Sequence, residues 1–157
     1  MTTNNFAFSG SSGFLHHLSK EHQAIDHELK IVEGTFQRTD PAHSTSDISK
    51  LLTSRMIRLK EVLSKHFCEE ESIGCLEEAV ARRPKLSHQA TLIGQEHVEL
   101  MTDLDRLIEA VEMEPEDDEK LIELKKTFDR FVEMVKLYES NESLLVRRGL
   151  NAVLDEV

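Results

Sequence analysis

Six polar side chains stand at positions where a buried apolar residue would be expected, and all six are of types that bind metal ions. They are His22, His66, Glu70, His97, Tyr138 and Glu142. His66 and Glu70 are one helical turn apart, as are Tyr138 and Glu142, which places each pair on one face of an α-helix. A mixture of imidazoles and carboxylates suits iron, manganese or zinc. We therefore interpret the six residues as candidate metal ligands.

For any one of these residues, a purely structural role is the simpler interpretation, because histidine and tyrosine are often partly buried in protein cores. The two carboxylates are harder to explain in this way. A buried carboxylate without a cation is costly or keeps its proton, whereas coordination to a metal removes that penalty. For the set as a whole, metal binding is the favoured interpretation.

Apolar residues at alternating intervals of three and four predict four long amphipathic helices that carry the six residues. The stripes contain Leu15, Leu18, Ile25, Leu29, Val32 and Phe36; Leu52, Met56, Leu59, Leu63 and Ile73; Ala90, Ile93, Leu100, Leu104, Leu107 and Val111; and Leu121, Leu124, Phe128, Phe131, Val135 and Leu145. Polar or proline-containing stretches at 39–47, 82–84 and 112–119 separate the segments. The pattern predicts an all-α protein, an up-down-up-down four-helix bundle.

The same topology predicts that the six residues lie at one level of the bundle. His22 and His97 occur early in the first and third helices, whereas the other four residues occur late in the second and fourth. Because consecutive helices run in opposite directions, these positions meet at the same end, within about two turns of ~5.4 Å each. We expect one polar layer within an apolar core.

Length and composition limit the remaining possibilities. A chain of 157 residues with 39% hydrophobic content supports one core. We expect a flexible leader at 1–13 and a single bundle at 14–157. The first residues lack a secretory signal, and no apolar run is long enough to span a membrane.

Charge and cysteine content favour a cytoplasmic protein that binds neither nucleic acid nor membrane. The net charge of −11 would repel phosphate backbones and anionic lipids. Cys68 and Cys75 are too far apart on one helix to form a disulfide and are expected to be reduced. The sequence does not indicate an oligomeric state.

The motifs KEH at 20–22 and QEH at 95–97, each followed by a pair one turn apart, resemble the hemerythrin-like HHE cation-binding domain. The resemblance covers nearly the whole chain after the leader and reveals an internal repeat of two helical hairpins. It implies a four-helix bundle that holds non-haem iron, usually as a pair. The ligands it implies are His22, His66, Glu70, His97 and Glu142. Tyr138 departs from the family, which has histidine there, and His97 lacks the HxxxH neighbour of oxygen-carrying hemerythrins.

A pair of irons fits the ligand set, with a single iron as the alternative. If Glu70 and Glu142 each bridge both ions, the six residues leave positions for a bridging oxide or hydroxide and for a small ligand such as O2, peroxide or nitric oxide. Zinc and manganese accept similar ligands, so iron follows from the resemblance.

Three classes of function fit this interpretation, and the sequence leaves open whether the protein is an enzyme. The first class binds or senses O2, nitric oxide or iron. The second is a di-iron oxidoreductase that acts on peroxide or nitric oxide, and the third is a metal-stabilised structural bundle. Neighbouring polar residues are expected mainly on solvated helix surfaces, with two alternatives: the carboxylates could orient the imidazoles of the ligands, and the two histidines could supply an additional ligand. These are Asp26, Glu69, Glu96 and Glu139, together with His16 and His17.

Overall fold

In a computed structural model, the protein is helical over nearly all of the described residues, which are 11–37, 44–73, 75–113, 115 and 117–150. The elements are α2 (Ser11–Phe36), α3 (Thr45–Ile73), α4 (Cys75–Arg82), the 3-10 helix η1 (Pro84–Leu86), α5 (Ser87–Glu112) and α6 (Asp118–Leu150). No strand occurs in this part of the chain. The predicted all-α class is confirmed.

Local capping explains where two of the long helices begin. Before α3, the Ser44 hydroxyl accepts a hydrogen bond from the Asp47 amide at 3.2 Å, and the Asp47 carboxylate accepts one from the Ser44 amide at 3.4 Å. This reciprocal arrangement is a capping box. Before α6, the Asp117 carboxylate accepts a hydrogen bond from the Lys120 amide at 3.0 Å. Both caps satisfy amide groups that the first helical turn leaves without partners.

The structure differs from the predicted boundaries in two places. Helix α2 begins at Ser11, so residues 11–13 are helical and do not belong to a leader, and residues 1–10 lie outside the described part. The second predicted segment is divided into α3 and the short α4, with Gly74 of the sequence between them.

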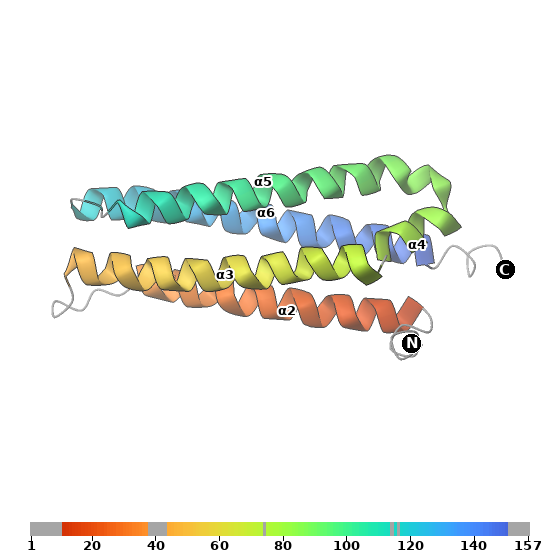
Figure 1. The fold of residues 1–157 in the computed structure, drawn as a ribbon, viewed down its shortest axis with the longest axis horizontal. Helices are drawn as coiled ribbons and strands as arrows, with labels where there is room; N and C mark the ends of the chain where they lie inside the picture. The colour runs from red at the N-terminus through yellow and green to blue at the C-terminus, as the bar shows by residue number, and fades with distance from the viewer. Residues whose placement is uncertain (1–10, 38–43, 74, 114, 116, 151–157) are drawn as a thin grey trace.

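The four long helices lie side by side along the length of the molecule (Figure 1). The chain reverses direction between α2 and α3 and again between α5 and α6 (Figure 1). Helix α2 packs against α3 and α6, and α5 packs against the same two helices from the other side. Helix α4 packs against α6 near the end of the bundle where α6 finishes. The result is a helical bundle whose helices enclose a hydrophobic interior.

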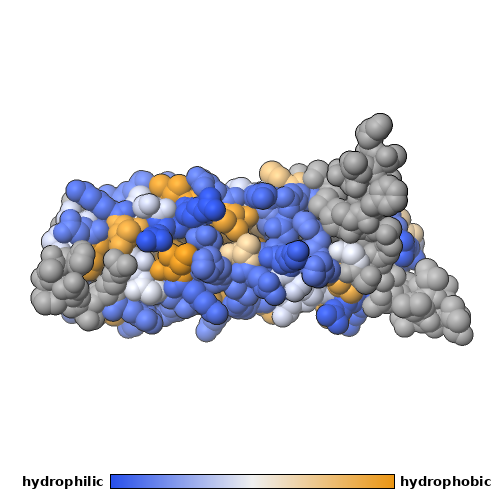
Figure 2. Space-filling model, turned by 90° about the horizontal axis from the view of Figure 1, so that it is seen from below, coloured by the Kyte–Doolittle hydropathy of each residue, from blue (hydrophilic) through white to orange (hydrophobic). Residues whose placement is uncertain are grey.

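That interior contains the predicted apolar stripes. The buried members are Leu18, Ile25, Leu29, Val32, Leu52, Met56, Leu59, Leu63, Ile93, Leu100, Leu104, Leu107, Val111, Phe128, Phe131, Val135 and Leu145. The surface seen in Figure 2 is mainly hydrophilic, with smaller groups of apolar side chains. None of the described helices combines the length and apolar character needed to span a bilayer. Burial of the stripes provides the main driving force for packing the helices together.

Candidate metal centre

A polar layer interrupts the apolar core at the positions that the sequence indicated. The His66 and Tyr138 side chains are each 2% exposed, and Glu142 is fully enclosed. His22 and His97 are half-buried beside them. Because α3 and α6 present these residues on their inward faces, the layer lies between helices and away from the loops.

Glu142 is the central acceptor of this layer. Its Oε1 atom lies 2.7 Å from His22 Nε2 and 3.1 Å from His66 Nε2. Its Oε2 atom accepts a hydrogen bond from the Tyr138 hydroxyl at 2.6 Å. Three side chains from three helices therefore converge on one buried carboxyl group.

Tyr138 connects this carboxylate to the third histidine. Since its single proton is donated to Glu142, the 2.8 Å contact with His97 Nε2 is one in which the imidazole donates to the phenol oxygen. His66 Nε2 lies 3.3 Å from the same oxygen. The His97 ring is held by stacking on Phe67, with ring centroids 4.0 Å apart. The three imidazoles thus all present Nε2 toward the same small space.

This space fits a metal ion. One donor atom from each of His22, His66 and Glu142 lies within 4.8 Å of the other two. Two ligands on opposite sides of an ion are separated by about 4.2 Å when each bond is about 2.1 Å, so such donors can share one cation without large movement. The donor set also suits a transition metal, since it combines neutral imidazoles with an anionic oxygen.

The structure brings five of the six candidate residues into this connected layer. The exception is Glu70, which lies in α3 one turn after His66 but whose side chain is outside the described part of the structure. Its predicted role remains a prediction.

A second group of polar residues lies next to the layer, and for two of them, His17 and Glu69, the sequence favoured a surface position over a role beside the ligands. His17 Nε2 lies 3.6 Å from Glu21 Oε1 and 3.5 Å from Glu69 Oε2. Glu21 Oε1 in turn lies 3.9 Å from His66 Nδ1. His17 and Glu21 are four residues apart, the same spacing as His66 and Glu70. The spacing could have indicated a site, but neither residue belongs to a predicted apolar stripe.

Two carboxyl groups around the layer have strongly shifted pKa values. Burial raises the pKa of Glu21 to about 7, and its hydrogen bond with Glu69 adds to this effect. The same hydrogen bond lowers the pKa of Glu69, so Glu21 is the partner that carries the proton. Burial also raises the pKa of Glu139 to about 8, with repulsion from Asp26 as the next cause. Glu139 is only 7% exposed, so the prediction that it lies on a solvated surface is wrong.

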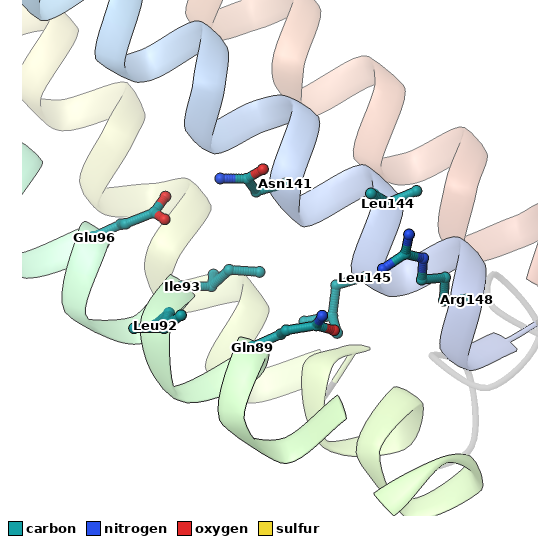
Figure 3. A pocket seen from close by; sticks show the side chains of 8 residues that line it. All are labelled: Gln89, Leu92, Ile93, Glu96, Asn141, Leu144, Leu145 and Arg148. Atoms are coloured by element: carbon teal, nitrogen blue, oxygen red, sulfur yellow. The ribbon is translucent and has the colours of Figure 1, made fainter. Parts of the chain in front are cut away.

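A pocket of about 200 Å³ lies between α5 and α6 near this end of the bundle. Glu96 and Asn141, the residues before His97 and Glu142, face each other across it (Figure 3). Leu92, Leu144 and Leu145 supply apolar walls. The pocket is small and partly apolar. On each of the two helices, one of its lining residues directly precedes a residue of the polar layer in the sequence.

No protein-family model, curated protein or solved structure matches this chain. The functional evidence is therefore the layer itself: a buried carboxylate, three convergent imidazoles and a tyrosine, within an all-helical bundle.

Proposed function

We propose that this chain is a hemerythrin-like, up-down-up-down four-helix bundle that holds non-haem iron and binds or senses O2, nitric oxide or iron. The observation that carries the proposal is the convergence of His22, His66 and Tyr138 on the enclosed carboxylate of Glu142. Ionised carboxylates are rarely buried unless a charge partner or a metal compensates for the lost hydration.

The donors fall into two groups, which supports a pair of ions. His22, His66 and Glu142 provide one set, with donor atoms close enough to share a cation. His97 and Tyr138 are linked to Oε2 of Glu142 and provide a second set, to which Glu70 of the following turn of α3 is added by the resemblance. Glu142 faces both groups, with Oε1 toward one and Oε2 toward the other. A single ion would use only the first set.

The residues of the chain would contribute binding, shielding and control of protons. If iron were bound, it would supply a redox-active Lewis acid suited to a small ligand. The apolar stripes above and below the layer exclude bulk water. In the metal-free protein the Tyr138 hydroxyl holds a proton next to Oε2 of Glu142, and this proton would be released if the phenol oxygen bound iron. The pocket beside Glu96 and Asn141 provides space for a diatomic molecule or peroxide near the layer.

Two other functions compete with this proposal. A di-iron oxidoreductase would use the same layer and pocket but would turn over peroxide or nitric oxide. A structural bundle is supported by a different observation: the layer satisfies many of its own hydrogen bonds with protein groups alone. Catalytic assays with peroxide and nitric oxide separate the first competitor from a binding protein.

Metal analysis tests the proposal directly. Protein isolated from iron-replete cells should carry about two equivalents of iron per chain, the number expected of a bundle with a carboxylate-bridged pair. Glu142→Gln preserves the side-chain shape but removes the charge, and it should lower the iron content sharply.

Glu133→Gln is the matched control, because Glu133 is exposed on the same helix. One equivalent of iron per chain in every preparation would contradict a pair of ions and would support a single iron. Absence of bound iron in wild type, together with unchanged stability after chelation, would favour the structural bundle.

A further inference from the structure

The group formed by His17, Glu21 and Glu69, which we name the outer cluster, is distinct from the residues assigned to the metal centre. One donor atom from each of its three side chains lies within 4.8 Å of the other two. All three side chains are partly buried, with exposures of 33%, 16% and 31% respectively. The outer cluster is therefore open to solvent on one side and enclosed by protein on the other.

The helices explain why these residues meet. His17 and Glu21 are one turn apart on α2 and thus share a face, and α2 packs against α3, which carries Glu69. Each distance from His17 Nε2 to the two carboxylates, 3.6 and 3.5 Å, is longer than a hydrogen bond. Two ligands of a tetrahedral ion with bonds of about 2.1 Å are separated by about 3.4 Å. The spacing is therefore closer to that of ligands sharing a cation than to that of directly bonded groups.

The lysine contact of the outer cluster adds little positive charge, and one carboxyl oxygen of the cluster is left without a hydrogen-bond donor among the described residues. Lys65 Nζ approaches Glu69 Oε1 at 3.8 Å, but Lys65 is 73% exposed and contributes little through such a contact. Glu21 Oε1 is shielded from solvent, and among the described residues it has no hydrogen-bond donor. A buried carboxylate oxygen without a donor is unfavourable, and a cation at this point would compensate for it.

We propose that the outer cluster binds one divalent transition-metal cation, separate from the metal centre. One imidazole and two carboxylates form a ligand set suited to Zn²⁺, Fe²⁺ or Mn²⁺, and the exposed side leaves positions for water. Its ligands differ from those of the centre, so the proposal does not depend on the function proposed above. Glu21 Oε1 lies 3.9 Å from His66 Nδ1, which places this cation directly behind the imidazole that faces Glu142.

Calorimetric titration of the metal-free full chain with Zn²⁺ tests the proposal. The background variant Glu142→Gln weakens the centre and leaves the outer cluster intact, so it should still bind one Zn²⁺. Adding His17→Ala and Glu69→Gln should weaken this binding by more than about tenfold, since loss of even an outer-shell partner costs that much.

The matched control in the same background is His16→Ala with Glu61→Gln, because both residues are exposed on the same two helices. This pair should leave Zn²⁺ affinity unchanged, and circular dichroism should show equal helix content in all variants. If Glu142→Gln does not fold, the comparison is made without it, and His17→Ala with Glu69→Gln should then bind one equivalent less than wild type.

Anomalous diffraction at the zinc edge supplies an independent readout of position. An anomalous peak bounded by His17, Glu21 and Glu69 supports the proposal. If the same protein takes up no iron at the metal centre, the proposed function is contradicted but the outer-cluster proposal still holds. Equal Zn²⁺ affinity with and without the His17 and Glu69 substitutions would overturn it. Zinc bound only at the centre would do the same.

Discussion

Glu142 shows how a single residue organises the centre. Its two oxygens face different neighbours, with His22 and His66 at Oε1 and Tyr138 at Oε2. Because the side chain is fully enclosed, water cannot replace a lost partner. Changes at any of these neighbours should therefore affect Glu142 strongly.

Tyr138→Phe should destabilise the metal-free protein by about 1–3 kcal/mol, because Oε2 of Glu142 loses its donor and remains buried. Urea denaturation measures this loss. In the iron-loaded protein, a phenolate ligand would give a broad visible absorption band, and Tyr138→Phe should abolish it while much of the iron remains bound. An identical spectrum in wild type and variant would restrict Tyr138 to hydrogen bonding.

Tyr138→His extends the same test. An imidazole at this position restores the usual ligand set of the family that the sequence resembles. An anionic phenolate stabilises ferric iron more than imidazole does. We therefore expect Tyr138→His to raise the reduction potential of bound iron, which redox titration measures. A lower potential in the variant would contradict phenolate ligation.

Glu139 should make the metal-free protein less stable as pH rises. Folding raises its pKa from the ordinary value of 4.5 to about 8, mainly through burial. Over this interval the folded chain holds a proton that the unfolded chain has released, so the free energy of unfolding falls with increasing pH, by up to about 1.4 kcal/mol per pH unit for one group. Glu139→Gln should flatten this decline in denaturation curves measured from pH 5 to 8. Glu133→Gln, on the exposed side of α6, should leave the slope unchanged.

At the scale of elements, the contact between α4 and α6 depends on a glycine. A side chain at Gly149 of α6 would overlap Ala79 of α4, meeting its Cβ and its backbone. Ala79 is itself fully buried, so the two helices cross with no space for an added methyl group. This close approach allows the short α4 to cover the end of the bundle.

Gly149→Ala should therefore destabilise the protein by about 1–3 kcal/mol, the usual cost of overpacking. Gly94→Ala is the matched control, because Gly94 lies within α5 and an added Cβ would meet nothing within 4 Å. The control should stabilise the protein by about 0.5–1 kcal/mol through helix propensity alone. Urea denaturation measures whether each substitution lowers or raises the free energy of unfolding. Stabilisation by both substitutions would show that α4 moves aside without cost.

At the scale of the whole molecule, the long bundle combines an apolar interior, a polar layer and a net charge of −11. The layer places ionisable groups where apolar side chains would otherwise pack. A cation held by His22, His66 and Glu142 would compensate for buried negative charge and would connect α2, α3 and α6. Metal binding should consequently stabilise the fold as a whole.

Removal of metal should lower the melting temperature by about 5 °C or more, since a ligand present at a hundred times its dissociation constant adds about 2.7 kcal/mol. Differential scanning calorimetry with and without a chelator measures the change. Glu142→Gln should show a smaller difference between the two conditions. A melting temperature that chelation does not alter, in protein shown to carry metal, would contradict this expectation.

Helical periodicity predicted most of the features of the fold and of the candidate site that the sequence indicated. The alternation of three and four residues identifies which side chains share a face, so it predicts both the buried stripe and the polar residues that interrupt it. Leu59, Leu63 and His66 illustrate this point, because all three are buried in the structure as their spacing indicates. The same periodicity identified His22, His97, Tyr138 and Glu142 as inward-facing residues, and the expected order of alternately directed helices predicted that they lie in one layer.

Tertiary structure decided the contacts between helices, because the distance between two helix faces depends on how both are packed. Glu139 follows Tyr138 and adjoins the stripe, and only the packing of neighbouring helices determines that it is buried. His17 and Glu69 are far apart in the chain, and their spacing in the sequence does not predict that His17 Nε2 lies 3.5 Å from Glu69 Oε2. The donation from Tyr138 to Glu142 likewise depends on side-chain geometry, since their spacing along α6 permits the contact but does not require it.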